Sequence, residues 1–586
     1  MCIRDSYYTD PLNYGYRAIL GYKYNTIKAD DAPIVEIDLR YEDKGGTVLD
    51  PSVADVYFIW KTSEGGETWF EAAQSEWCTN PKEQAKKFSS KMYFTMYLHP
   101  DYAGKTITAA GVRIIPKTGT ALKLDVDLNY FYFAYDARQS NFTTQYLIAL
   151  NEYVKMTNDT ETLAKAMPKA RRGMQWLLTT LRGENGLLDV SWLYGHDGRG
   201  NIVSHGIANG YWDMLATPAV DLETNIHFYQ ALTAMSEMEE MLQLSGAPVD
   251  EISEVCVRMS ADTGRRTAVY EETAASLNTL AGKVKTNIQK NVENGGFWDS
   301  AKERFVAGKT PDNTVMDFGF VMWNLEALAC GIATPQQKAA VMSWIDGTRI
   351  VTGDTSTGND IYKYEFAPRT TTLNNVSQYL WSYKDPGFGK SVPNGGSVLA
   401  WSYYDLLSRI DVNGADDSYA RLSQICDWYE KVKAAGGTGS NFYQAYYNGK
   451  GIEYVVQGDG TTGSLGLDSE FLESCMLYSS VPYGFFGMNA GYGTLSFTNQ
   501  LPSELSFWRI QNLLFAGRNY NVEMTKDSFT LSGITGGTGG LTVSFTFLSG
   551  NTVMVNGKVT ENGVTRNADG SVTVTVPFEN AVVCCR

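Results

Sequence analysis

The chain has 586 residues, of which 43% are hydrophobic and 13% aromatic, with a formal net charge of -16 and a pI of about 4.9. This composition excludes a disordered chain, and the length predicts about three or four domains. The negative charge argues against nucleic-acid and anionic-membrane partners, and no apolar run is long enough to span a membrane. A neutral solute fits better, because the 13 Trp and 36 Tyr can pack on the apolar faces of sugar rings.

Cysteine and histidine lack the spacing of metal sites. The eight Cys are scattered, the adjacent Cys584 and Cys585 form no C-x-x-C motif, and we expect mostly buried thiols. The four His form neither an H-x-x-x-H nor an H-E-x-x-H pattern. We therefore predict no metal site and no cofactor. The many acidic loops leave calcium open, although none has the residue order of an EF-hand.

Residues 7–128 are predicted to form an antiparallel β-sandwich. Apolar and charged residues alternate strictly in residues 35–41, as in a half-buried strand. Further strands are predicted at residues 56–60, 92–98 and 106–115. We expect a packing or lid role for this domain. Residues 1–6 are expected to be a scar of sequence assembly, so a signal peptide and the localisation stay open.

From residue 129 to residue 492 the apolar pattern predicts paired helices in one closed domain. The predicted helices are residues 142–155, 160–181, 221–244, 265–291, 316–329, 335–344, 396–410 and 419–432. Long loops rich in Gly, aromatic and acidic residues separate the pairs, and loops of this length are uncommon unless they build a site. Residues 493–586 are predicted to form a second antiparallel sandwich, with strands at 541–547 and 572–576 and turns at 533–540 and 556–557.

A turn rich in Gly and aromatic residues, 206–217, leads directly into the helix predicted at 221–244. It carries Trp212 and Asp213. A weakly solvated carboxylic acid beside an aromatic ring suits the cleavage of a glycosidic bond, because the ring supports the sugar and the acid protonates the leaving oxygen. The alternative is that Asp213 caps a turn while Trp212 packs in the core.

A second acidic and aromatic loop carries Glu365 and Arg369. These residues could bind sugar hydroxyls, or Glu365 could itself be the catalytic acid or base, since an arginine orients a carboxylate and keeps it ionised. The alternative is a buried ion pair that holds the loop. Four further aromatic residues are candidate sugar platforms, with core packing as the alternative for each: Trp192, Tyr194, Trp298 and Trp381.

The order of a β-sandwich, paired helices and a second β domain resembles the six-hairpin glycosidase superfamily, whose catalytic domain is an α/α toroid. Residues 210–213, Gly-Tyr-Trp-Asp, are similar to the segment that carries the general acid in trehalases and processing α-glucosidases. Residues 135–138, Tyr-Asp-Ala-Arg, with Asn141, resemble the start of the first helix in rhamnosidase-like members. Loop-to-helix transitions at 317–319 before 324–327, and at 395–397 before 400–403, are also similar to those of such toroids.

The resemblance implies an inverting two-carboxylate mechanism, in which the acid and the base stand about 6.5–9.5 Å apart. Asp213 would be the general acid, and Glu470 or Glu473 the base, because the base of the superfamily comes late in the toroid. The alternative for these two residues is a solvated helix start. Asp136 and Arg138 would bind the first sugar or form a structural pair. The predicted partner is an oligosaccharide or polysaccharide, with the oligomeric state open.

Three other functions compete with a glycoside hydrolase. A disaccharide phosphorylase of the same fold needs a basic or hydroxyl-rich phosphate site near the base, whereas the late loops are acidic. A polysaccharide lyase needs a Tyr/His pair and a positive cleft, which the -16 charge and four His argue against. A glycan-binding protein would keep the toroid with one catalytic carboxylate lost.

Overall fold

The computed structural model describes residues 2–3, 26–29, 34–43, 52–73, 76–80, 87–96, 99–117, 124–134, 140–190, 194–196, 202–205, 218–249, 256–258, 266–310, 314–375, 387–436, 446–447, 465–466, 472–536 and 540–586. The chain divides into two compact units. One comprises Met1–Asn141, Gln175–Val220 and Ile252–Glu271, and contains the N-terminal sandwich. The other comprises Phe142–Met174, Asp221–Glu251 and Glu272–Arg586, and contains most of the helices and the C-terminal sandwich.

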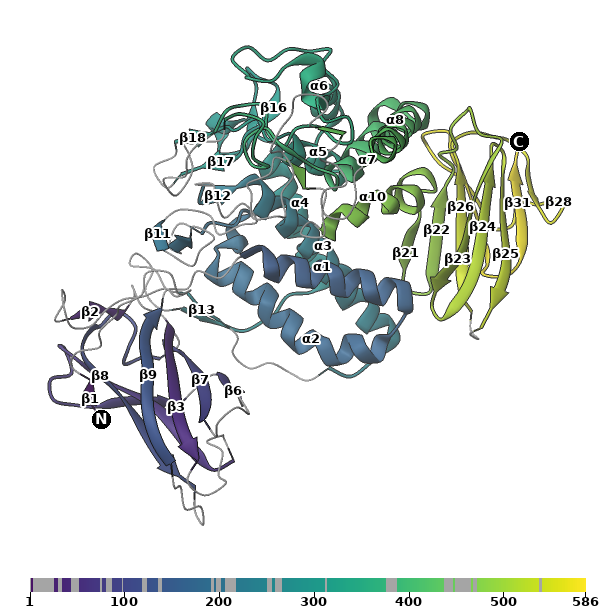
Figure 1. The fold of residues 1–586 in the computed structure, drawn as a ribbon. Helices are drawn as coiled ribbons and strands as arrows, with labels where there is room; N and C mark the ends of the chain where they lie inside the picture. The colour runs from purple at the N-terminus through teal and green to yellow at the C-terminus, as the bar shows by residue number, and fades with distance from the viewer. Residues whose placement is uncertain are drawn as a thin grey trace. The chain divides into compact units, whose positions relative to one another are not determined.

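The N-terminal sandwich consists of two antiparallel sheets (Figure 1). In the first, β3 (Ile34–Asp43) lies between β7 (Lys87–Thr95) and β9 (Leu124–Ala134), and β6 (Glu76–Asn80) pairs with β7. The second is built on β8 (Thr106–Pro116), with the partners β4 (Ala54–Thr62), β1 (Cys2–Ile3) and β2 (Ile27–Lys28), while β5 (Phe70–Ala73) pairs with β4. The strands predicted at 35–41, 56–60 and 106–115 are therefore confirmed, whereas the one predicted at 92–98 begins earlier, at Lys87, and ends at Thr95.

Alternate residues of the two sheets form the core of this sandwich. Val35 and Ile37 of β3 face the same cluster as Phe58 and Trp60 of β4. The rings of Phe58 and Trp60 stack with centroids 5.2 Å apart. Because burying a large apolar side chain stabilises by about 1.5–3 kcal/mol, the period of two along each strand is enough to fix which face turns inward.

The first helix pair is α1 (Ser140–Thr157) and α2 (Thr160–Gln175), which continues as the π-helix η3 (Trp176–Thr180). Asn158, with φ of 55°, turns the chain between them. Asp159 caps α2, since its Oδ1 accepts a hydrogen bond from the Thr162 N–H at 2.9 Å. The Nζ of Lys169 lies 5.4 Å from the centre of the Tyr146 ring, which holds the two helices side by side (Figure 1).

The later helices also pack in sequential pairs: α3 (Leu222–Ser245) with α4 (Ala274–Gln289), α5 (Val321–Ala329) with α6 (Pro335–Ile345), and α7 (Trp401–Asn413) with α8 (Ala415–Ala434). In addition, α5 packs against both α3 and α7. Nearly every residue of α5 and of the first half of α3 is buried, as expected for helices surrounded by others. Helix pairs with α3, α5 and α7 on the inside agree with the predicted toroid, while its six hairpins stay a prediction.

Three predicted helix starts are wrong. The helices predicted from residues 265, 316 and 396 begin at Ala274, Val321 and Trp401, and each is preceded by a short strand: β14 (Arg266–Ala268), β18 (Val315–Met316) and β19 (Ser397–Val398). The backbone explains the later starts. Thr273 caps α4 by accepting a hydrogen bond from the Ser276 N–H, and Gly319 has a φ of 60°, which a right-handed helix does not contain. Before α7, Ser397 and Val398 pair as a strand with Leu465 and Gly466.

The C-terminal sandwich packs two sheets through a phenylalanine-rich core. One sheet has the order β21 (Asn489–Gly491), β22 (Thr494–Thr498), β26 (Thr542–Phe547), β30 (Val572–Pro577), β29 (Val564–Arg566). The other has the order β23 (Phe507–Phe515), β24 (Arg518–Thr525), β25 (Ser528–Thr535), β31 (Ala581–Cys585), β27 (Val553–Val555), β28 (Lys558–Val559). Phe529 stacks on Phe545 across the core, with centroids 4.9 Å apart.

The prediction of a purely antiparallel C-terminal sandwich is wrong in one place. β22 and β26 pair in parallel. The strands β23, β24 and β25 of the second sheet lie between them in the sequence, so the chain returns to the first sheet in the same direction. The predicted turn at residues 556–557 is confirmed. Asn556 and Gly557 both have positive φ, 50° and 77°, as a two-residue hairpin turn requires.

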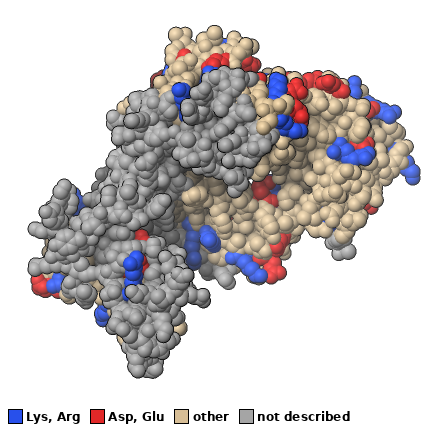
Figure 2. Space-filling model, viewed as in Figure 1, with Lys and Arg blue, Asp and Glu red and all other residues tan. Residues whose placement is uncertain are grey.

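The surface carries charges of both signs. On the face in Figure 2, Lys and Arg alternate with Asp and Glu in small groups, and uncharged areas separate them over the described residues. None of the described helices combines the length and the apolar character that crossing a bilayer requires.

Candidate active site

The inner helices α3, α5 and α7 begin at the same end of the helical region. Contacts of the first residues show this. The Val321 N–H and the Trp401 indole both donate to Thr370, and the Leu222 N–H donates to the Ala307 carbonyl, close to Phe305, which Asn324 in the first turn of α5 holds. His227, in the second turn of α3, contacts Glu326, in the second turn of α5, and Tyr404, in the first turn of α7, contacts the same carboxylate. The loops that precede the three helices therefore meet at one end, where side chains from different segments can form a site.

The first turn of α3 is capped by a buried carboxyl group. The Oδ1 of Asp221 accepts a hydrogen bond from the Thr224 N–H at 2.8 Å, and the Asn225 side chain donates to the Asp221 carbonyl at the same distance. Burial raises the pKa of Asp221 to about 6, although the Thr224 bond opposes this shift. The predicted acid Asp213 lies eight positions before this cap in the sequence.

Four polar residues, here called the His227 cluster, connect α3, α5 and α7: Glu223, His227, Glu326 and Tyr404. The Nε2 of His227 lies 2.9 Å from the Oε1 of Glu326, and the Tyr404 hydroxyl donates to that oxygen at 3.2 Å. Glu223 precedes His227 by one helical turn, so the two side chains share a face of α3. Glu223, His227 and Glu326 are only 4%, 7% and 2% exposed.

The cluster holds its protons at neutral pH. Burial raises the pKa of Glu223 to about 8, against the favourable charge of His227. Burial alone would lower the pKa of His227, but the charge of Glu326 and the hydrogen bond to it outweigh burial and raise this pKa to about 9. At pH 7 His227 is therefore an imidazolium ion facing Glu326, and Glu223 is a neutral acid.

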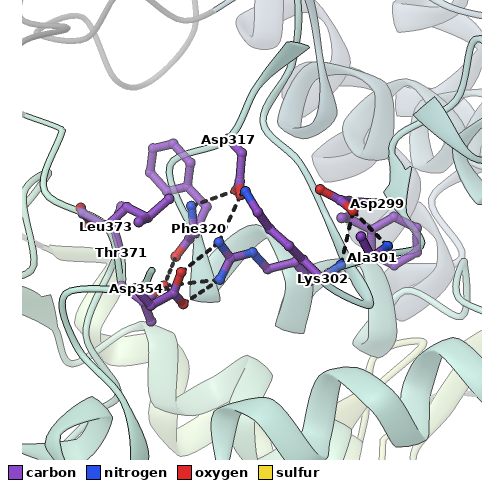
Figure 3. A network of polar contacts seen from close by, with 12 residues as sticks. Asp299, Ala301, Lys302, Asp317, Phe320, Asp354, Thr371 and Leu373 are labelled. Carbon is purple, nitrogen blue, oxygen red and sulfur yellow. Dashed lines mark hydrogen bonds and ion pairs between the residues drawn. The ribbon is translucent and has the colours of Figure 1, made fainter. Parts of the chain in front are cut away.

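A second network, here called the Arg304 cluster, joins the loops before α5 to the loop after α6 and is built from Lys302, Arg304, Asp317 and Asp354. Figure 3 labels Lys302, Asp317 and Asp354 of this network. The guanidinium of Arg304 is fully buried and donates to both oxygens of Asp354, at 2.5 and 2.9 Å, and to Asp317 at 2.8 Å. Lys302 donates to the same Asp317 oxygen at 2.7 Å. Burial would raise the pKa of Asp317, but Arg304 and Lys302 outweigh it and lower this pKa, so the carboxylate stays charged.

Glu365 lies at the same end, in the loop after α6, and this loop contacts the start of α7. The Ser402 hydroxyl, in the first turn of α7, donates to the carbonyl of the next residue, Phe366. Glu365 has φ of 69°, which is uncommon for a residue other than glycine, and Arg421 holds its carbonyl through a hydrogen bond of 2.6 Å. Its carboxylate accepts from the Tyr446 hydroxyl and lies 3.7 Å from the Lys431 Nζ. With its side chain 32% exposed, it can meet a ligand.

Arg369 is placed differently. It is 3% exposed, and its guanidinium pairs with Asp360 at 3.0 Å and donates to the Gly395 carbonyl. The ring centres of Tyr364 and Phe388 lie 5.1 and 5.0 Å from it. These contacts match the buried ion pair that the sequence left as the alternative to sugar binding. Since Arg369 and Glu365 have different partners, the two residues do not form one ion pair with each other in the described contacts.

The late acidic segment approaches the start of α7 through a short parallel pair of strands. β20 (Leu465–Gly466) pairs with β19, with Ser397 opposite Leu465 and Val398 opposite Gly466. The pairing brings the chain beside α7 a few residues before Glu470 and Glu473. The backbone of Glu473 lies in the 3-10 helix η9 (Leu472–Cys475), which leads into α10 (Met476–Ser479), and α10 packs on α7.

Trp298 is half-buried in β15 (Trp298–Asp299), and its ring meets the edge of Phe305 with centroids 5.0 Å apart. The backbone of Tyr194 lies in β10 (Tyr194–His196). The other predicted residues lie outside the described residues: Asp136, Arg138, Trp192, Trp212, Asp213, Trp381 and Glu470. Their roles stay predictions.

Sequence reasoning gave no role to the His227 cluster. The signal was present, since a Glu and a His one helical turn apart interrupt the apolar face of α3, and Glu326 is the single charged residue of α5. An isolated carboxylate in an apolar helix requires a partner, which could have pointed to one of the four His. Over the described part of the chain, His, Cys, Asp and Glu form no group of three or more that could hold a metal ion.

Neither a protein-family model nor a curated protein sequence matches the chain. Three solved structures are similar over part of their length. They are a protein described as a kojibiose phosphorylase from the human microbiome, with 10% identity and a TM-score of 0.32, the family 78 rhamnosidase of Bacillus sp. GL1, with 11% and 0.34, and the Streptomyces avermitilis α-L-rhamnosidase in complex with L-rhamnose, with 10% and 0.33.

The matches cover 76%, 85% and 96% of this chain but 46%, 50% and 52% of the three proteins, so the chain spans about half of their length. Similarity at this level assigns no activity to the chain. The function has to be argued from its own residues.

Proposed function

We propose that the chain is a glycoside hydrolase that cleaves an O-glycosidic bond with inversion, with Asp213 as general acid and Glu473 or Glu470 as general base. The observation that carries the proposal is the pairing of β19 with β20. It brings the late acidic segment to the start of α7, at the end where α3 also begins, and Asp213 lies shortly before α3 in the sequence. Two carboxyl groups from distant segments at one end of the helices suit this chemistry.

Glu365 is the third candidate and would serve better as a base than as an acid. Its carboxylate accepts a hydrogen bond from Tyr446 and faces the ammonium group of Lys431. Both neighbours stabilise the ionised form, which a base needs in order to activate water. Its positive φ supports a functional role, because strained backbone is enriched at binding and catalytic sites.

The surface supports an uncharged substrate. The net charge is -16, and the described part of the face in Figure 2 has no broad patch of one sign. A polyanion would be repelled, whereas a neutral sugar would be recognised by hydrogen bonds and aromatic rings. Trp298, which is half-buried near the loops before α5, is a candidate for the aromatic ring that packs against the sugar.

The test is hydrolysis of aryl α- and β-glycosides and short oligosaccharides, with and without inorganic phosphate, followed by NMR of the released anomer. We expect hydrolysis with inversion and no phosphate dependence. Asp213→Asn should lower kcat by on the order of 10²–10⁴-fold, while Asp569→Asn, in a turn of the C-terminal sandwich, controls for loss of a carboxylate. Full activity of Asp213→Asn would exclude Asp213 as the general acid, and release of a sugar phosphate would identify a phosphorylase instead.

A further inference from the structure

The His227 cluster places charged groups among buried helices, which costs stability. Replacing buried charged groups by apolar residues of similar size is often neutral or stabilising, so the presence of a cation, an anion and a neutral acid at one point needs a reason. All three helices that meet there are inner helices, and they meet within two turns of their starts. The cluster therefore fixes how α3, α5 and α7 are placed relative to one another at the end that carries the loops.

A hydrogen bond fixes direction as well as distance, which apolar packing does not. The Glu326 Oε1 accepts from two sides, from α3 through His227 at 2.9 Å and from α7 through Tyr404 at 3.2 Å. A rotation or a shift of α3 by a fraction of a turn would break the first bond. Asp221, the cap of α3, would move with this helix start, because it holds the first turn through the Thr224 N–H.

Titratable groups face His227 from all three helices. Asp221 and Glu223 come from α3, Glu326 from α5 and Tyr404 from α7, and the thiol of Cys330 at the end of α5 lies close enough to interact with Glu326. One donor is left over, because an imidazolium has two N–H groups and the Nδ1 of His227 has no hydrogen-bond partner among the described residues. A further acceptor at this end of α3 would complete the network.

We propose that Glu223, His227, Glu326 and Tyr404 are positioning residues for the glycosidase reaction, and that the His227–Glu326 ion pair fixes the starts of α3, α5 and α7 relative to one another at the end that carries the loops. The inference rests on the proposed function. The four residues act through the helix start and do not contact the reacting atoms.

The protonation of the cluster can be tested without a substrate. Because the chain has only four His, labelling histidine with ¹³C at Cε1 gives at most four ring signals, and His227→Gln assigns one of them. We expect the His227 signal to titrate more than one pH unit above an ordinary histidine and to move down by at least one unit in Glu326→Gln. Titration of wild-type His227 near pH 6.5 would overturn the proposed ion pair.

The positioning role is tested by kinetics on whichever glycoside the wild type cleaves. Glu326→Gln and His227→Gln should lower kcat by about 10–100-fold with KM within about threefold, because misplacement of a catalytic group slows the reaction more than it weakens binding. Tyr404→Phe, which removes one hydrogen bond and no charge, should fold normally and lower kcat by roughly threefold to tenfold.

The matched control is Glu239→Gln. It breaks an ion pair in the other half of α3, where Arg171 donates to Glu239 at 2.8 and 2.6 Å. It should lower stability and leave kcat unchanged. If the cluster variants behave like this control, with lower stability and a normal kcat for the folded protein, the positioning role is overturned. A wild type that cleaves no glycoside would overturn the proposed function and the positioning role together, while the NMR titration would still decide the ion pair.

Discussion

The His227 cluster and the Arg304 cluster are both buried, polar and located near the starts of the inner helices, but they hold their charges in different ways. In the Arg304 cluster, guanidinium and ammonium groups surround two aspartates, and the pKa of Asp317 is lowered. In the His227 cluster, the cation is an imidazolium and the pKa of Glu223 is raised to about 8.

The difference lies in which groups can titrate near neutral pH. Arginine stays protonated at any pH at which the protein folds, so the Arg304 cluster keeps its charges and joins its loops permanently. Histidine and a buried glutamic acid exchange protons between pH 7 and 9, so the His227 cluster can change its charge under working conditions. We expect the first network to govern stability, and the second to govern stability and activity in a pH-dependent way.

The largest effect should come from breaking the Arg304 cluster. Arg304→Met leaves Asp354 and Asp317 buried without their main partner, so the free energy of unfolding should fall by about 3–5 kcal/mol. Urea denaturation at pH 7 measures this loss. Arg304→Lys keeps the charge but loses the bidentate contact with Asp354, so its free energy of unfolding should lie between those of the wild type and Arg304→Met. Equal stability of all three proteins would refute the structural role.

The pH dependence of stability should distinguish the two clusters. Because the pKa of His227 rises from 6.5 to about 9 on folding, its contribution is fully present below pH 6.5 and is lost as the pH rises to 9. Glu223 acts in the same direction between pH 4.5 and 8, since the folded state keeps a proton that the unfolded state has released. The loss for His227 is on the order of 3 kcal/mol at most.

Urea denaturation of the wild type and of His227→Gln at several pH values from 6 to 9 measures this slope. The wild type should lose stability as the pH rises, and the variant should lose less. Parallel curves for the two proteins would show that His227 does not titrate with a raised pKa. Arg304→Lys is the control, because it alters the other buried network and leaves His227 in place, so its curve should keep the slope of the wild type.

Glu365 offers a smaller test of strain at the same end of the helices. Glu365→Gly and Glu365→Ala both remove the contacts with Tyr446 and Lys431, but only glycine tolerates a φ of 69° without strain. The glycine variant should therefore be more stable than the alanine variant by about 1 kcal/mol, while both lose activity to the same extent. Urea denaturation and kinetics measure the two quantities. Equal stability would mean that the backbone is not strained.

The smallest effect should come from an ion pair outside both clusters. Arg171 and Glu239 are partly exposed, with 22% and 11% of their side-chain surfaces accessible, so Glu239→Gln should cost about 1 kcal/mol or less. Raising the salt concentration should shrink this difference, which thermal unfolding at low and high salt would show. A loss of stability as large as that caused by Arg304→Met would mean that burial does not determine how much an ion pair contributes to stability.

Most of the fold could be predicted from residue patterns. Strict alternation located β3 and β30, and the apolar stripe of α3 located that helix to within one residue at each end. The errors came where a local pattern was continued too far. The helix predicted from residue 396 begins at Trp401, because Ser397 and Val398 pair as a strand with β20, and strand pairing between segments far apart in the sequence leaves no periodic signal.

The site could be predicted only in outline. A turn before α3 and an acidic loop before α7 are visible as composition, so Asp213 and Glu365 could be named. The partners could not be named, because the contact between His227 and Glu326 joins residues 99 positions apart and that between Tyr446 and Glu365 joins residues 81 apart. Arg369 shows the same limit, since its pairing with Asp360 in place of Glu365 depends on the path of the loop.

The turn between α1 and α2 is held from far along the chain. The Oδ1 of Asn158 accepts a hydrogen bond from the Gly493 N–H, 335 positions later, and the Met156 carbonyl accepts from Ala516. During synthesis on the ribosome the first helix pair therefore emerges long before the strands that secure it. Until the C-terminal sandwich is made, the ends of these two helices lack their final contacts, and the nascent chain should depend on chaperones over this interval.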